Sequence, residues 1–97
     1  MPTYVMLVNW TDQGIRTVTE GPKRVDAAKA LLKDMGGEFK SLYMTMGRYD
    51  LVVVYDAPDD AVAARFTLML GKTGNVRTSS MKAFSEQAFR QIVTSIG

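Results

Sequence analysis

The order of strand-like and helix-like segments is the feature that most constrains the fold of this chain. Runs rich in valine, methionine and aromatic residues, which are typical of strands, occupy residues 4–10, 39–46, 49–55 and 76–83. Apolar residues at helical spacing follow Pro22, before the second strand, and Pro58, before the fourth. Ser85 is placed to cap a short last helix. The predicted order is strand-helix-strand-strand-helix-strand, followed by that helix.

This order predicts an α+β fold of the ferredoxin-like kind. Two right-handed crossovers and one hairpin produce a four-stranded antiparallel sheet in the order 4-1-3-2, with the helices on one face. The chain makes one domain, residues 1–97, because its length is near the usual size of a single hydrophobic core. The residues from Thr11 to Gly14 are predicted to form a turn, and residues 15–20 a loop.

Gly47 and Arg48 are predicted to form a two-residue type II′ hairpin, because that turn favours glycine at its first central position. The turn fixes which residues of the two strands oppose each other. The predicted pairs are Met46 with Tyr49, Met44 with Leu51, Leu42 with Val53, Thr45 with Asp50, Tyr43 with Val52 and Ser41 with Val54.

One face of this hairpin is almost wholly apolar, so we assign it to the helices, with Met44, Met46 and Tyr49 in or beside the core. In the first strand the matching assignment places Val5 and Leu7 under the helices. The uncovered face of the sheet, hereafter the open face, is then predicted to carry Tyr4, Met6, Val8, Trp10, Tyr43, Thr45, Asp50 and Val52.

So much apolar surface on an open face predicts a partner. Burying a few hundred Å² at about 25 cal/mol per Å² stabilises a complex by roughly several kcal/mol. A second copy of the chain is the simplest cover. Two sheets packed face to face would form a closed, barrel-like homodimer with a central cavity.

Composition excludes several kinds of chemistry. Cysteine and histidine are both absent, so the chain cannot form a disulfide, a Cys/His zinc site, histidine-ligated haem, a cysteine nucleophile or a histidine-based triad. A metal would need a carboxylate-rich site. Asp59 and Asp60 are better explained as acids at a helix start. We expect neither a metal nor a cofactor.

Charge and hydropathy argue against two further kinds of partner. The net charge of +2, with both signs interleaved, is too weak to indicate nucleic acid or a membrane surface. The N-terminus lacks the features of a signal peptide, and no apolar run approaches the length of a membrane helix. The predicted location is cytoplasmic.

The topology places the candidate ligand-binding residues Trp10, Thr45 and Arg77 at one end of the sheet, together with Asp50. Asp50 is a speculative catalytic acid or base, because a carboxylate in a partly apolar pocket can have a raised pKa. The alternative is a hydrogen bond to Thr45 or to hairpin backbone, or an ion pair with Arg48 or Arg77. Aspartates near turns usually satisfy local backbone groups in this way.

Two further side chains have alternative readings of the same kind. Arg77 can hold a carboxylate or phosphate in a bidentate fork, or form a plain ion pair within or between subunits. Tyr43 is a candidate ligand-binding residue that can line an aromatic pocket with Trp10. Packing at the dimer interface explains both aromatic residues equally well.

Several short motifs occur in a specific order along the chain. They are Thr11-Asp12-Gln13-Gly14, Pro22-Lys23-Arg24, Tyr43-Met44-Thr45-Met46-Gly47, Gly47-Arg48-Tyr49-Asp50, Gly74-Asn75-Val76-Arg77-Thr78 and Ala83-Phe84. This set resembles the motifs of the GYD family of small prokaryotic proteins, from Tyr4 to about Phe89, with G-x-Y-D as its signature. Met44 departs from the family pattern, which often has tryptophan there, and we expect a packing change at that position.

The resemblance implies membership of the dimeric α/β-barrel superfamily, which agrees with the predicted fold and homodimer. That superfamily includes cofactor-free monooxygenases, isomerases, haem-degrading enzymes and ligand-binding modules, so the fold does not choose a function. Our leading hypothesis is a homo-oligomeric small-ligand-binding or accessory protein with a cavity between paired sheets. One alternative is a cofactor-independent enzyme, isomerase- or monooxygenase-like, using Asp50, Arg77 and Tyr43. The other is a structural or protein-interaction module.

Overall fold

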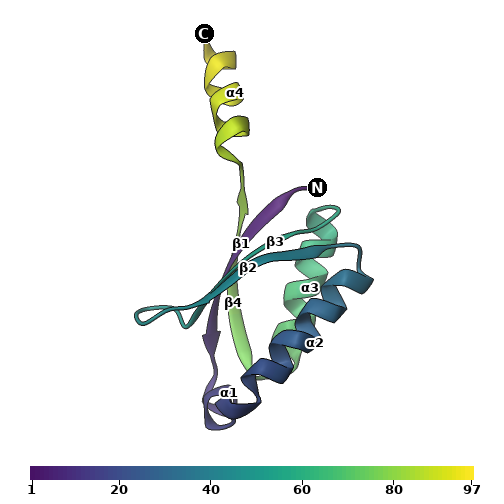
Figure 1. The fold of residues 1–97 in the computed structure, drawn as a ribbon, viewed down its shortest axis with the longest axis vertical. Coiled ribbons are helices and arrows are strands. Elements are labelled where there is room, and N and C mark those ends of the chain that lie inside the picture. The colour runs from purple at the N-terminus through teal and green to yellow at the C-terminus, as the bar shows by residue number, and fades with distance from the viewer.

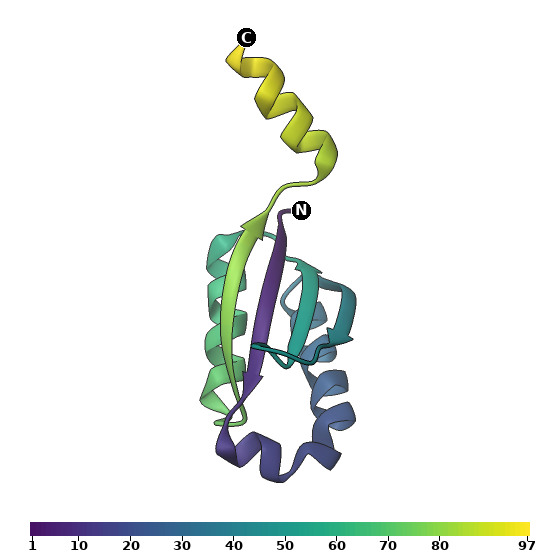
Figure 2. The same ribbon diagram turned by 90° about the vertical axis from the view of Figure 1, so that its left-hand side faces the viewer.

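The computed structural model describes all 97 residues, and it has two layers with one helix apart from them (Figures 1 and 2). The strands are β1 (Thr3–Trp10), β2 (Glu38–Met44), β3 (Leu51–Asp56) and β4 (Val76–Ala83). The helices are α1 (Asp12–Arg16), α2 (Gly21–Asp34), α3 (Asp60–Lys72) and α4 (Glu86–Ile96), with a 3₁₀ turn at Val18–Glu20. None of these helices combines the length and the hydropathy of a membrane-spanning segment.

The strands form one antiparallel sheet in the order β2-β3-β1-β4, as predicted. Helices α2 and α3 cover one face, and in Figure 2 the other face of the sheet looks toward the viewer with both helices behind it. The core lies between the two layers. Tyr55 stands at its centre, with ring centroids 5.3 Å from both Tyr4 and Phe66, and Leu32 of α2 is fully buried beside them. The ferredoxin-like α+β fold is confirmed.

The predicted facing of β1 is wrong. Tyr4, Met6 and Val8 are the buried residues of this strand, and Met6 is only 2% exposed. Met6 lies directly opposite Val53 of β3, which faces the helices. Both sets of alternate residues in β1 are apolar, so the sequence pattern does not fix which set is buried. The larger Tyr4 and Met6 fill the space under the helices, and Val5 takes the open face.

The open face therefore differs from the predicted one in its β1 residues, and it is mixed, because Asn9 and Arg77 lie on it beside Leu7 and the valines. Directly paired residues of neighbouring strands share a face. The register puts these residues on it: Val5, Leu7 and Asn9 from β1, Val52 and Val54 from β3, Tyr43 from β2, and Arg77, Ser79 and Met81 from β4. Of these, Tyr43 is 65% exposed.

The β2–β3 register is confirmed, but the predicted turn is wrong. Met44 pairs with Leu51, as predicted, yet Gly47 lacks the positive φ that a type II′ turn needs. Strand β2 ends at Met44 and β3 begins at Leu51. Residues 45–50 between them, hereafter the β2–β3 loop, stand out from the open face (Figure 1). Met46 on this loop is 94% exposed, so its predicted place in the core is also wrong.

Two smaller predictions also need correction. The segment predicted as a turn and loop contains α1, because Thr11 caps this helix by accepting a hydrogen bond from the Gly14 N–H. Met44 and Tyr49 are absent from the core as well. Met44 lies on the helix side of the sheet with Leu51, as predicted, but it is exposed, and Tyr49 lies outside the strands, partly exposed. Ser85 caps α4 through the Ala88 N–H, as predicted.

A polar contact joins α3 to the sheet. The Tyr4 hydroxyl donates to the Asp60 carboxylate, which also lies 3.1 Å from the Lys82 ammonium. Burial and this hydrogen bond raise the pKa of Tyr4 to about 12. The same hydrogen bond and Lys82 lower the pKa of Asp60.

These shifts predict a loss of stability in alkali. Unfolded tyrosine releases its proton near pH 10, whereas folded Tyr4 keeps it to about pH 12, so the free energy of unfolding falls between those values. Tyr4→Phe removes this contribution and should make the fall shallower. Urea unfolding from pH 9 to pH 12 measures it, with Tyr49→Phe as the matched control. An unchanged fall in Tyr4→Phe would contradict the assignment.

Candidate functional site

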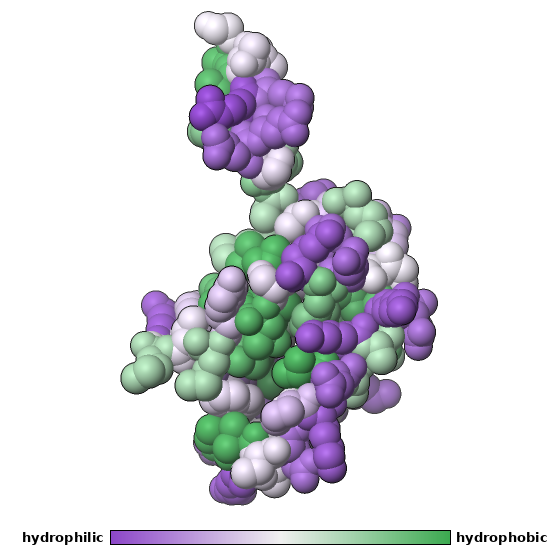
Figure 3. All heavy atoms as spheres, in the orientation of Figure 1, coloured by the Kyte–Doolittle hydropathy of each residue, from purple (hydrophilic) through white to green (hydrophobic).

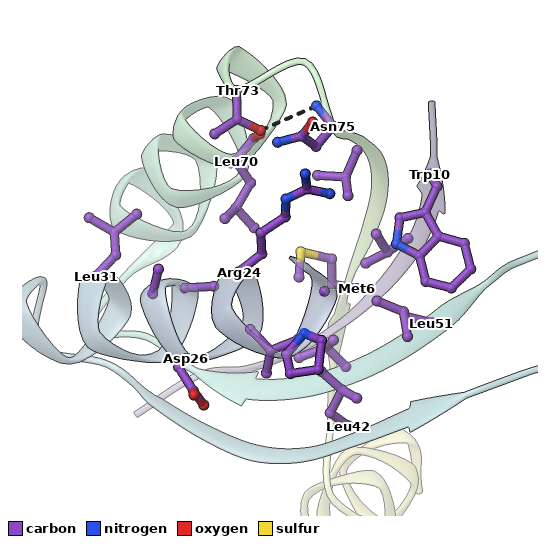
Figure 4. Close-up of a pocket in the computed structure, with 18 of the residues that line it drawn as sticks. Met6, Trp10, Arg24, Asp26, Leu31, Leu42, Leu51, Leu70, Thr73 and Asn75 are labelled. Atoms are coloured by element: carbon purple, nitrogen blue, oxygen red, sulfur yellow. Dashed lines mark hydrogen bonds between the residues drawn. The ribbon is translucent and has the colours of Figure 1, made fainter. Parts of the chain in front are cut away.

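An apolar groove lies between α2, α3 and the sheet (Figure 4). Its volume is about 640 Å³, and 16 of its 22 lining residues are hydrophobic, so it favours an apolar occupant. The sheet contributes its floor through Met6, Val8 and Leu51. Leu31 of α2 and Leu70 of α3 lie on its walls. This groove lies on the helix side of the sheet, opposite the open face on which the predicted inter-sheet cavity would form.

Trp10, a predicted ligand-binding residue, lies at the end of this groove with its indole nitrogen turned toward the cavity (Figure 4). Trp10 has the same alternation as Met6 and Val8, so it lies on the helix side and its predicted place on the open face is wrong. The indole N–H donates no hydrogen bond within the chain. It is therefore free to donate to a ligand.

Asp50 fixes the backbone of Trp10. Its carboxylate accepts the Trp10 N–H at 2.9 Å, and its own N–H donates to the Val8 carbonyl at 2.9 Å. These two bonds extend the pairing of β1 with β3 beyond Leu51. Asp50 thus satisfies local backbone, which was the alternative to its role as an acid or base.

The residues after β1 are joined to the start of β4. The Thr11 N–H donates to the Asn75 carbonyl at 3.0 Å, and the Thr11 hydroxyl donates to the Gly74 carbonyl. Gln13 adds a hydrogen bond to the Asn75 side chain. Two of the motifs singled out in the sequence, T-x-x-G and G-N-V-R-T, therefore hold each other in place.

Glycine is required at two positions of this junction. A Cβ atom on Gly14 would lie 1.9 Å from the Asn75 carbonyl oxygen, which no side chain tolerates. Gly74 has a φ of +84°, a conformation that other residues rarely adopt. The junction depends on both glycines because the two backbones meet in direct contact.

Arg24 ties α2 to the same corner. Its guanidinium donates to the Gly14 carbonyl and to the Thr17 hydroxyl. The P-x-R motif thus joins the other motifs at the end of β1, hereafter the Trp10 corner: Trp10, Thr11, Gly14, Asp50 and Asn75. The corner holds one end of the groove open, and its polar groups are largely used in doing so.

The remaining candidate residues do not meet in one site. The Thr45 hydroxyl donates a hydrogen bond to the Tyr49 carbonyl and stabilises the β2–β3 loop. Tyr43 lies on the open face, away from the groove. Arg77 is exposed, opposite Asn9 on the open face, and forms no ion pair within the chain. The structure therefore brings Trp10, Thr45, Asp50 and Arg77 to one end of the sheet, as predicted, but Tyr43 and Arg77 do not line the groove.

Sequence reasoning missed most of the groove. Val25, Met69 and Val76 line it, although their spacing predicts ordinary core positions. A cavity forms there because α2 and α3 are too far apart to close over the sheet. One signal was present: Ala27 and Ala28 on α2 are too small to fill the space beneath that helix. No cluster of three or more acidic side chains that could hold a metal is present.

Together, the fold and the groove define a small ferredoxin-like α+β protein with an apolar groove on the helix side of its sheet. The chain belongs to the GYD domain family, whose model matches residues 4–93. This membership accounts for the order of motifs that meet at the Trp10 corner.

A curated relative and two solved structures are similar to the chain. The chain is 36% identical over 84 residues to the "Glutamine synthetase and cystathionine beta-lyase binding protein" of Thermus thermophilus, covering 86% of this chain and 88% of the relative. The hypothetical protein PHS023 from Pyrococcus horikoshii has a TM-score of 0.56 at 25% identity, with 89% and 93% of the two chains covered. TTHA0845 from Thermus thermophilus has a TM-score of 0.54 at 22% identity, with 88% and 95% covered, and shows the fold alone.

The hydrogen bond from Trp10 to Asp50 predicts how Asp50 responds to substitution. Asp50→Ala should lower the free energy of unfolding by about 1.5–3 kcal/mol, because it leaves the Trp10 N–H without its acceptor. Asp50→Asn should keep most of that stability, since an amide oxygen can also accept. Urea unfolding measures both variants. Equal loss in the two variants would show that Asp50 acts through its charge and not as a backbone acceptor.

Proposed function

We propose that this protein is a homo-oligomeric binding protein of the accessory kind, whose groove holds a small apolar organic ligand. The observation that carries the proposal is the apolar groove of about 640 Å³ with the free indole N–H of Trp10 at its end. Pockets of this size with a few polar groups are typical of small-molecule sites. The indole donor, together with the Arg24 guanidinium that also lines the groove (Figure 4), would orient a ligand that carries a polar atom.

An enzymatic role has less support. A general acid or base must be free to reach the substrate. The Asp50 carboxylate already accepts the Trp10 N–H. Tyr43 lies on the other side of the sheet, and the Arg77 guanidinium lies beside Gly71 of α3, outside the lining of the groove. At the polar end of the groove, the backbone N–H of Asn75 donates to the Thr73 hydroxyl oxygen (Figure 4). The groups of the alternative enzyme mechanism are therefore not assembled around one substrate position.

The ligand groove is tested with an apolar fluorescent probe, 8-anilinonaphthalene-1-sulfonate. The wild-type chain should bind it saturably, with a rise in probe fluorescence. Ala28→Leu places a larger side chain in the groove and should weaken binding at least about tenfold. Ala30→Leu makes the same change on α2 outside the groove, at an exposed position, and should bind like the wild type. Equal binding by both variants would contradict the groove as the site.

The homo-oligomer rests on the open face. Val5, Leu7, Val52 and Val54 lie there side by side, only partly buried, and no element of the chain covers them. A contiguous apolar sheet face of this kind marks an interface. Pairing with the same face of a second copy is isologous and closes after two subunits.

This interface predicts that a charged side chain on the open face dissociates the dimer. Leu7→Lys would bury an unpaired ammonium between the sheets and should raise the dimer dissociation constant at least about 100-fold. Leu68→Lys makes the same change on α3, at a residue that is 73% exposed, and should leave self-association unchanged. Sedimentation equilibrium measures both. A wild-type chain that is monomeric at all concentrations would refute the homo-oligomer.

Binding of another protein is a second candidate, favoured by the name of the Thermus thermophilus relative. The β2–β3 loop supports this candidate, because Met46 is almost fully exposed there and flexible methionines suit protein contacts. Under this candidate the groove carries no ligand, and Ala28→Leu would not affect the bound partner. The probe experiment therefore separates the two candidates.

A further inference from the structure

Helix α4 is an amphipathic helix that packs on nothing in its own subunit. It follows β4 after only Phe84 and Ser85 and stands beyond the end of the sheet, clear of α2 and α3 (Figures 1 and 2). Its apolar residues are Phe89, Ile92, Val93 and Ile96, and Ile96 is 81% exposed. Their spacing of three and four residues puts them on one side of the helix.

A helix of this kind needs a surface to pack on. It has only 11 residues, and isolated helices shorter than about 12–15 residues are marginally stable in water. Most helical stability in proteins comes from burying the apolar side. The Ser85 cap contributes, but it leaves four large apolar side chains in water. The structure therefore lacks the surface that α4 is built to meet.

The apolar side of α4 continues the open face. In Figure 1 the open face looks to the left, away from α2 and α3, and in Figure 3 the apolar side chains of α4 show along its left-hand edge. Met81 on β4 and Phe84 in the connection lie between the two surfaces, and both are exposed. One apolar surface thus runs from the sheet through Phe84 onto α4.

We propose that α4 is an arm that packs on a second copy of this chain, as an extension of the interface between the open faces. The inference rests on the homo-oligomer of the proposed function. A second copy that covers the open face lies on the side to which the apolar residues of α4 already point. The two-residue connection and the Ser85 cap hold the arm outward, toward that copy and away from its own sheet.

The area of the arm fits this role. Large side chains such as Phe84 and Phe89 bury about 150–250 Å² each, so the arm adds on the order of 500 Å² per subunit. A stable interface buries about 800 Å² per partner. The arm alone does not reach that value, so it needs the further buried area that the sheet face can supply. The arm thus acts with the sheet face and not as an independent contact.

Amide hydrogen exchange of the full chain tests the arm. In the wild-type dimer the amides of α4 should be protected, because the helix is packed on the partner. In the dissociated Leu7→Lys variant the amides of α4 should exchange at least about 100-fold faster, while those of β1 and β3 stay protected. Protection of α4 in that monomer would overturn the proposal, since the helix would then pack on its own subunit.

The same measurement separates the two proposals. A wild-type dimer whose α4 amides are unprotected overturns the arm and leaves the homo-oligomer intact. A wild-type monomer overturns both.

Substitutions in the helix supply the second readout. Phe89→Gln with Val93→Gln keeps good helix-forming residues and should weaken dimerisation at least about tenfold in sedimentation. Gln87→Ala with Gln91→Ala changes the opposite side of α4 and should have no effect on dimerisation. Equal dimerisation of the two double variants would overturn the proposal that α4 packs on the second copy.

Discussion

The hydrogen bonds at the end of β1 are the constraint on which the rest of the structure depends. The Asp50 carboxylate holds the Trp10 N–H, and the Asn75 carbonyl holds the Thr11 N–H. These bonds join β1 to the start of β3 and of β4 at one point. Each satisfies a backbone group that would otherwise lose its partner at a strand end. The same bonds fix Trp10 at the end of the groove, so the corner that closes the fold also forms one end of the candidate site.

The two faces of the sheet serve different roles in this account. The helix side carries a groove because α2 and α3 leave part of the sheet uncovered, and its polar groups are few. The open side carries valines and leucine that suit a second copy, and α4 extends that surface. In the function that we propose, ligand binding and self-association use opposite faces of one sheet. The β2–β3 loop leaves the open face at the same end of the sheet as the Trp10 corner. The loop on one face and the end of the groove on the other therefore lie close together.

The sequence predicted the fold and the hairpin register because both depend on strong local signals. Glycines end elements at Gly36 and Gly74, and the order of strands and helices allows few topologies. The facing of β1 was not predictable from alternation, since Leu7 and Met6 are equally apolar and only the packing of Tyr4 on Tyr55 decides. The groove was missed for a related reason: periodicity identifies which residues face the core, not whether the helices close over them.

The signal of the Trp10 indole N–H in a ¹H–¹⁵N spectrum tests the central claim most directly, because Trp10 is the only tryptophan. We expect this signal to shift saturably as 8-anilinonaphthalene-1-sulfonate is added, while the backbone amides of Leu7 and Val52 on the open face stay in place. A fixed indole signal with shifting amides of Leu7 and Val52 would place the apolar site on the open face and contradict the account.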